Sequence, residues 1–437
     1  MIKRFVIAAP KSNSGKTTVS LGILRLLKRK GLNVQPFKIG PDYIDPKFHE
    51  LASEKRGVNL DGFMMSDEEI FKSLSDFSES NTIQCIEGVM GLFDGANKTN
   101  GSTAELAKKL KVPVLLVIDA KAIAYSIAPL IQGFVNFDSE LQIMGVIFNR
   151  VGSERHYQIL EEACSDIGVK TFGYLRTVDK AEIPSRHLGL NIEGIEQFDK
   201  AIDRIADEIA LQVDWESILD ASAESETEKR IATIQNKPEF VFAVAQDEAF
   251  NFIYPQLISA MKEMGKVLFF SPLRDDHLPD ADFVYLPGGY PEMHLEQLSG
   301  NKPMLNQIMD FTSNGGYVFA ECGGMMYLGK EMIDKEGNAF EMVGHFNFST
   351  SIKDPKLHLG YRSITIEDHS FKGHEFHYSV IQNEQLETAI GEIQNARNKK
   401  VKTQLFLKQN VLASYIHFFI GNNQKLKTLM SLISNSN

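Results

Sequence analysis

The chain has few cysteines and no excess of positive charge, and each shortage excludes a class of protein. Three cysteines (Cys85, Cys164 and Cys322) among 437 residues cannot form a disulfide framework or a cysteine-rich zinc site. A reducing cytoplasm is therefore the compartment that we expect. The net charge of −11 argues against a nucleic-acid binder or an anionic-membrane binder. No apolar run approaches the length of a membrane-spanning helix.

What is present predicts an α/β protein of two domains. In the first half, short apolar runs alternate with helical patterns, which is typical of a mostly parallel sheet covered on both faces. The predicted strands there cover residues 5–9, 34–38, 82–87, 114–119, 144–149 and 171–175. A second α/β series follows at 240–245, 267–271, 283–287 and 317–321, and then a strand-rich region that ends near residue 417.

The two series are separated by a small, polar and charged stretch, which is typical of a connector. We therefore predict an N-terminal domain over residues 1–213, a linker over 214–238 and a C-terminal domain over 239–430.

The first predicted strand leads directly into a phosphate loop. Residues 10–17 read Pro-Lys-Ser-Asn-Ser-Gly-Lys-Thr, which matches the P-loop pattern except for Pro10 at the first glycine. Backbone N–H groups at the helix start can still hold phosphates, Lys16 can reach the β/γ oxygens, and Thr17 can hold Mg²⁺. A solvated loop is the weaker alternative. For Lys11, a surface lysine and a second phosphate contact are equally good interpretations. The predicted ATP-binding residues are Lys11, Gly15, Lys16, Thr17, Thr18 and Asn149.

Acidic residues follow the second and third predicted strands, in segments 38–49 and 87–95. Ligands of open α/β sheets bind beyond the carboxyl ends of the strands, so one or two of these acids should bind Mg²⁺. For Asp45, which precedes a proline, a turn role is a serious alternative. For Glu87 the alternative is weaker, because a lone glutamate at the end of a buried strand is costly without a partner.

The second predicted site surrounds Cys322, which follows an apolar strand and precedes two glycines. Such a strand-to-helix turn exposes a nucleophile and frees the next backbone N–H for an oxyanion. His417, which ends a late strand, is the predicted base, with a plain strand-end histidine as the alternative. The predicted oxyanion hole uses Gly288, Gly289 and Gly323, although Pro-Gly-Gly is also a common tight turn.

Two further observations narrow the prediction for this thiol site. Phe419 stands two residues after His417, where an orienting carboxylate is expected, so a Cys–His dyad is favoured over a triad. His374 and His377 are expected on opposite faces of one strand, which argues against a zinc site formed with Glu375.

Together these motifs resemble the cobyrinate a,c-diamide synthases. The resemblance rests on segments 38–49, 87–95, 186–190, 287–292, 321–328, 373–379 and 413–417. It implies an ATP-binding domain similar to dethiobiotin synthetase, joined to a class I glutamine amidotransferase domain of flavodoxin-like fold. The amidotransferase would hydrolyse glutamine through Cys322 and His417. The synthetase would phosphorylate the c and then the a carboxylate of a corrin precursor, and ammonia would displace phosphate.

By motif position the resemblance also assigns residues in the first domain. Thr17, Asp45 and Glu87 are expected to bind Mg²⁺, and Asp94 is expected to be catalytic, while the division of labour among the acids stays open. The expected substrate contacts are Asp42, Tyr43, Arg186 and His187; for the last two, a solvated cationic loop pair is the alternative.

The expected partners are small molecules (ATP, glutamine and a tetrapyrrole carboxylate), with a homodimer as one further expectation. Hydrogenobyrinic acid or a nickel sirohydrochlorin is an alternative substrate. A partitioning-type P-loop ATPase is the alternative of another class, but it would not need Cys322, Gly288, Gly289 or His417.

Overall fold

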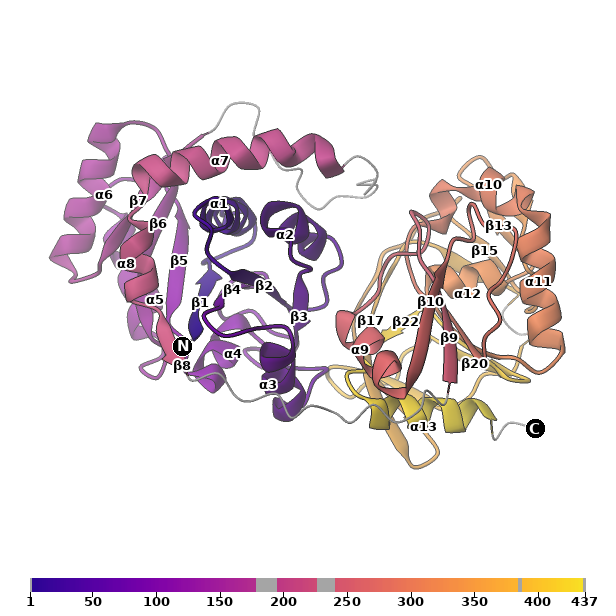
Figure 1. The fold of residues 1–437 in the computed structure, drawn as a ribbon. Helices are drawn as coiled ribbons and strands as arrows, with labels where there is room; N and C mark the ends of the chain where they lie inside the picture. The colour runs from indigo at the N-terminus through magenta and orange to yellow at the C-terminus, as the bar shows by residue number, and fades with distance from the viewer. Residues whose placement is uncertain (1, 178–194, 226–239, 384–386, 435–437) are drawn as a thin grey trace. The chain divides into compact units, whose positions relative to one another are not determined.

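A computed structural model describes residues 2–177, 195–225, 240–383 and 387–434 of the chain. These residues fall into two compact units, 1–230 and 231–437, which are described separately below (Figure 1). Within the described ranges, every helix is too short or too polar to span a bilayer.

The N-terminal unit is built on a parallel sheet in the order β3-β2-β4-β1-β5-β6-β7. Its strands are β1 (Ile2–Ala8), β2 (Val34–Ile39), β3 (Val58–Leu60), β4 (Ile83–Glu87), β5 (Val114–Asp119), β6 (Ile143–Val151) and β7 (Thr171–Arg176). The six predicted strands are confirmed to within about three residues at each end, and β3 is an addition. Because both faces are buried, the strands read as nearly continuous apolar runs.

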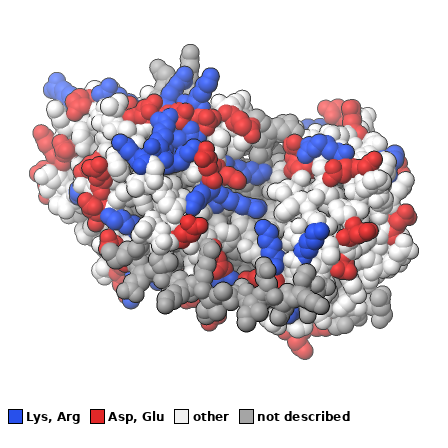
Figure 2. All heavy atoms as spheres, viewed as in Figure 1, with Lys and Arg blue, Asp and Glu red and all other residues white. Residues whose placement is uncertain are grey.

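Helices cover the sheet of this unit (Figure 1). They are α1 (Lys16–Arg29), α2 (Asp45–Ser53), α3 (Asp67–Asp76), α4 (Thr103–Leu110), α5 (Ile127–Asn136), α6 (Glu154–Asp166) and α7 (Asp199–Gln212), with a short 3-10 turn η1 (Ile195–Phe198) before α7. Helix α1 packs against α7, where buried Arg25 bonds to Asp199 and Asp203. Figure 2 shows basic and acidic side chains adjoining over these two helices.

The linker prediction is wrong for residues 214–225. They form α8 (Trp215–Asp220) and β8 (Ala223–Ser225), and β8 pairs antiparallel with the start of β1 through Ala223 and Arg4. The side chain of Asp214 caps α8, and Ile218 is buried in the core of the N-terminal unit. Composition alone did not indicate this sheet pairing, because the stretch is small and polar. Residues 226–238 lie outside the described residues.

The C-terminal unit is built on a second sheet, in the order β10-β9-β11-β12-β21-β20, which is parallel except for β20. Its strands are β9 (Phe240–Ala245), β10 (Gly265–Phe270), β11 (Phe283–Leu286), β12 (Tyr317–Glu321), β20 (Leu405–Lys408) and β21 (Val411–Ser414). The helical elements are α9 (Pro255–Met264), η2 (Pro291–Met293), α10 (Leu295–Gly300), α11 (Lys302–Ser313), α12 (Gly323–Leu328) and α13 (Asn423–Ser434).

Two small sheets complete this unit. One has the order β14-β13-β15-β18 and the other β19-β16-β17-β22. Their strands are β13 (Glu331–Ile333), β14 (Ala339–Glu341), β15 (Ser349–Ser351), β16 (His358–Ile366), β17 (His369–His377), β18 (Val380–Gln382), β19 (Glu392–Asn395) and β22 (Ile416–Phe418). The last sheet matters for function because β17 and β22 pair antiparallel beside the predicted thiol site.

Candidate active sites

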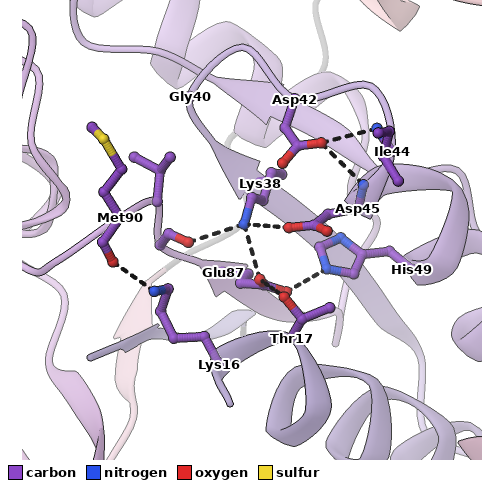
Figure 3. Close-up of polar contacts among 12 residues, drawn as sticks. Lys16, Thr17, Lys38, Gly40, Asp42, Ile44, Asp45, His49, Glu87 and Met90 are labelled. Carbon is purple, nitrogen blue, oxygen red and sulfur yellow. Dashed lines mark hydrogen bonds and ion pairs between the residues drawn. The ribbon is translucent and has the colours of Figure 1, made fainter. Parts of the chain in front are cut away.

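The phosphate loop connects β1 to α1, as the sequence predicts. Gly15 has a φ of +99°, and a Cβ there would lie 1.9 Å from Asn149 Nδ2, so only glycine fits. Asn149 Nδ2 donates to the Ser14 carbonyl at 3.0 Å. Asn149 therefore supports the loop itself, and its contact with a nucleotide stays a prediction. Lys16 is buried and its Nζ donates to the Met90 carbonyl at 2.5 Å, at the carboxyl edge of the sheet (Figure 3).

Glu87 is the centre of a buried polar cluster at the end of β4. Its carboxylate accepts hydrogen bonds from Thr17 Oγ1 at 2.7 Å, Lys38 Nζ at 2.9 Å and His49 Nε2 at 2.7 Å (Figure 3). Burial favours the neutral acid, but the charge of Lys38 and the contact with His49 outweigh it and hold the pKa of Glu87 well below its usual range. The partner that a buried glutamate requires is therefore present.

Lys38 and Asp45 complete this cluster. Lys38, near the end of β2, is 0% exposed, and its Nζ lies 2.7 Å from Asp45 Oδ2 and 3.0 Å from the Gly88 carbonyl. With Glu87, all three ammonium protons have an acceptor. Asp42 Oδ1 accepts from the backbone N–H groups of Ile44 and Asp45 at 2.9 and 3.1 Å, so Asp42 holds the turn into α2.

The cluster has the chemistry of a magnesium site. A threonine hydroxyl and two carboxylates are the hard oxygen ligands that Mg²⁺ prefers. Thr17 and Glu87 are already in contact, and Asp45 joins them through Lys38. The three residues predicted to bind metal are therefore brought together at the phosphate loop.

For the other predicted residues of this unit, the structure gives less information about a role at the site. Asp94 is exposed, and its Oδ2 accepts from the Gly91 N–H at 2.9 Å in the loop after β4. Tyr43 and Thr18 are half-buried, and Lys11 is exposed on the phosphate loop. Arg186 and His187 lie outside the described residues. The roles of these residues stay predictions.

Sequence reasoning did not single out Lys38 or His49. A lysine inside the apolar run of β2 is a signal that could have indicated Lys38, because a buried ammonium requires acceptors. His49 gives no comparable signal. Its approach to Glu87 depends on how α2 packs beside β4, which no local pattern contains.

Cys322 lies at the predicted turn between β12 and α12. Its φ of 46° is in the left-handed region, which is unusual for a residue with a side chain and is typical of a strained nucleophile turn. The Cys322 N–H donates to the Ser414 carbonyl of β21 at 2.7 Å, and this bond helps hold the turn. Burial and the charges of Glu292, Glu321 and Glu375 raise the pKa of the thiol well above its usual range, although the Gly323 N–H opposes this.

Gly288 lies close to both Cys322 and His417. A Cβ on Gly288 would stand 2.2 Å from His417 Cε1 and 3.3 Å from Cys322 Cβ, so the three residues meet at one point. The Gly289 N lies 3.2 Å from where a Cβ of Gly323 would stand. The predicted oxyanion glycines therefore gather at Cys322. Burial lowers the pKa of His417 well below its usual range, and the nearby His374 and His377 add to this, so the imidazole is neutral and can accept a proton.

Beside this site, three metal-ligating side chains approach one another. The ligand atoms of His358, Glu375 and His377 lie within 4.8 Å of one another. However, the two imidazole rings are parallel, at 2° and 4.7 Å, so their lone pairs do not converge on one ion. Glu375 already pairs with Arg362 at 2.5 Å and with His377 at 2.8 Å. The geometry therefore fits an ion-pair network better than a metal site.

Comparison with known proteins gives the two units their families. Residues 5–190 match the model of the "CobQ/CobB/MinD/ParA nucleotide binding domain", and residues 241–425 match the "CobB/CobQ-like glutamine amidotransferase domain". Over nearly its whole length the chain is 40% identical to a cobyrinate a,c-diamide synthase of Caldanaerobacter subterraneus subsp. tengcongensis, with 95% of each chain covered. The chain belongs to the a,c-diamide synthase family.

Other members of the family have equal similarity. A hydrogenobyrinate a,c-diamide synthase of Rhizobium meliloti is 40% identical, with 94% of this chain and 98% of that one covered. A cobyrinate a,c-diamide synthase of Listeria innocua is 39% identical, with 97% of both covered. The chain is thus an enzyme with a P-loop nucleotide-binding domain and a glutamine amidotransferase domain. A partitioning-type ATPase alone does not account for the second domain.

Proposed function

We propose that this chain amidates the a and c carboxylates of cobyrinic acid, with glutamine as the nitrogen donor and ATP as the activating substrate. The observation that supports this most is that one chain carries both required sets of groups. One is a phosphate loop beside buried oxygen ligands, and the other is a cysteine, a neutral histidine and glycine residues that lie close together.

The amidotransferase unit would release ammonia by nucleophilic catalysis. Because the pKa of the Cys322 thiol is raised, the resting thiol is neutral, and attack on the amide of glutamine requires a base. His417 would accept the thiol proton and return it to the leaving ammonia. The N–H groups of Gly323 and Gly289 would stabilise the oxyanion. Water would then hydrolyse the thioester to glutamate, with His417 again as the base.

The synthetase unit would activate the carboxylate of the ring that receives the nitrogen. Activation is needed because a carboxylate is a poor electrophile and its oxygen is a poor leaving group. The carboxylate oxygen would attack the γ-phosphoryl group of ATP to give an acyl phosphate and ADP, and ammonia would then displace phosphate. Lys16 would hold the transferred phosphoryl group. Mg²⁺ held by Thr17, Asp45 and Glu87 would neutralise phosphate charge, and Lys38 would fix the two carboxylates in place.

Hydrogenobyrinic acid is the second candidate substrate, because relatives named for each substrate are equally similar to this chain. The two rings carry the same carboxylates and differ in the central metal, so the chemistry at Lys16 and Cys322 is identical for both.

The experiment is a direct turnover assay. Purified protein is incubated with ATP, Mg²⁺ and glutamine and with cobyrinic or hydrogenobyrinic acid in parallel, and products are followed by mass spectrometry. We expect a diamide together with glutamate, ADP and phosphate from at least one ring. Glutamate release without a diamide from either ring would contradict the proposed substrates, and failure to release glutamate with any acceptor would contradict the role of Cys322.

A further inference from the structure

His417 has no acid at the position where an amidotransferase histidine is commonly oriented. Phe419 stands two residues later and its side chain is buried. Catalytic histidines need an orienting group, because the ring must present one nitrogen to the nucleophile at a fixed angle. The residues that pack against His417 therefore decide how its ring is held.

The imidazole ring of His374 stacks on the ring of His417. The two residues are directly paired across β17 and β22, so their side chains share one face of the sheet. Their rings are stacked, with centroids 4.9 Å apart and planes 17° from parallel. Phe252 packs on His417 as well, at 6.0 Å and a tilt of 52°. The flat contact with His374 thus fixes the plane of the imidazole.

His374 is itself held in place by Tyr254. The Tyr254 hydroxyl lies 3.3 Å from His374 Nδ1, and the two rings meet edge to face at 6.5 Å. Phe419 packs edge to face on Tyr254 at 5.5 Å. The residue that replaces the expected acid therefore contributes to the same aromatic chain, which leads from Phe419 through Tyr254 and His374 to His417.

Glu375 is next to His374 in the sequence, but its carboxylate bonds to other residues. It follows His374 on β17, so its side chain projects to the opposite face of the strand. There it accepts hydrogen bonds from Arg362, at 2.6 Å, and from Thr403, at 2.7 Å, and it contacts His377. These bonds stabilise β17, but none of them is a bond to His417.

We infer that His374 is the positioning residue of the glutaminase site, holding His417 in its productive orientation by ring stacking in place of a carboxylate. The inference rests on the proposed roles of Cys322 and His417. Burial and the charge of Arg362 lower the pKa of His374 to about 3, which keeps that ring neutral.

The test compares two substitutions that fill the same space. His374→Phe keeps a flat ring against His417, and His374→Leu has a similar volume but no ring. We expect His374→Leu to lower kcat for glutamine hydrolysis by about 10- to 100-fold, because small misplacements of a catalytic group cost rates of that order. KM for glutamine and amidation with ammonia should change little. His374→Phe should recover most of the lost kcat.

The rate at which a chloroketone analogue of glutamine alkylates Cys322 gives a second readout that does not depend on turnover. It should fall in His374→Leu and recover in His374→Phe. His345→Leu is the matched control, because His345 is also buried in this unit but contacts Thr312 in another region. Its kcat should match the wild type.

Equal kcat in the wild type and His374→Leu would overturn the inference, and so would an equal loss in the Phe and Leu variants. Failure of the proposed function is distinguishable. It would appear as glutamine hydrolysis that survives Cys322→Ala, whatever the result at His374.

Discussion

The N-terminal unit buries an ammonium among carboxylates, whereas the thiol site of the C-terminal unit buries a thiol and an imidazole that are neutral at pH 7. Lys38 bonds to Asp45 and Glu87 with no exposed surface, and the pKa of Glu87 is held low. In the other unit the pKa of Cys322 is raised and that of His417 is lowered. Burial also raises the pKa of the neighbouring Glu321 to about 8, although Tyr285 and the Phe418 N–H oppose it.

The difference follows from the two reactions. Phosphoryl transfer moves several negative charges, so the site that holds ATP needs charges that stay fixed. Hydrolysis of an amide through a thioester needs one proton to pass between thiol, imidazole and leaving group, and only a neutral imidazole can accept that proton. Burial serves both sites, because it strengthens the ion pairs in one and suppresses ionisation in the other.

The largest expected effect comes from removing the buried ammonium. In Lys38→Met the carboxylates of Asp45 and Glu87 lose their counter-charge, and breaking a buried pair in this way costs about 3–5 kcal/mol of unfolding free energy. We also expect amidation with glutamine and with ammonia to fail together. Trp215, the single tryptophan, packs against the core of the N-terminal unit, so its fluorescence during urea unfolding reports on this unit.

The comparison variant for this measurement is Lys108→Met, which removes a partly exposed pair with Asp138. It should lower the unfolding free energy far less, because solvent-exposed ion pairs contribute little to stability. Equal losses in the two variants would show that the buried cluster is not held by charge.

An effect confined to the second site is expected from Gly288→Ala. The new methyl group would stand 2.2 Å from His417 Cε1 and must displace the ring. We expect glutamine-dependent amidation to fall about 100-fold while ammonia-dependent amidation is kept. Gly300→Ala is the control, because nothing lies within 4 Å of a Cβ there. Unchanged use of glutamine in Gly288→Ala would contradict the placement of His417.

A further expected effect is a change in how stability depends on pH. Glu321 is protonated in the folded protein up to a pKa of about 8 but ionises near 4.5 when unfolded. The folded state therefore binds the extra proton between these values, and stability falls as pH rises from about 4.5 to 8. Glu321→Gln keeps the shape and removes the ionisation, so its unfolding temperature should fall less over this range. Identical pH profiles would show that Glu321 is not held neutral.

The positions of Cys322 and of the phosphate loop, each at a turn from a strand into a helix, could be predicted because each is a local pattern. A strand, a short loop and a helix are contiguous at residues 5–29 and at 317–328, so the chain order fixes where Lys16 and Cys322 lie. The pairing of His374 with His417, and of His49 with Glu87, could not be predicted. These contacts join segments that are 43 and 38 residues apart, through strand register and helix packing that no local pattern records.

The domain boundary shows the same limit. A small, polar segment is typical of a linker, yet Ala223–Ser225 pairs with β1 because its backbone hydrogen bonds do not depend on apolar side chains. The six N-terminal strands were predictable because burial on both faces leaves a continuous apolar run, while the three-residue β3 is too short to give that signal.

The separation of the two chemistries is tested most directly by Cys322→Ala assayed with glutamine and with ammonia as alternative nitrogen donors. We expect diamide formation with glutamine to fall to background and the rate with saturating ammonia to equal that of the wild type. Loss of both activities in a variant that still unfolds at the wild-type temperature would contradict it, because the synthetase unit would then depend on Cys322 itself.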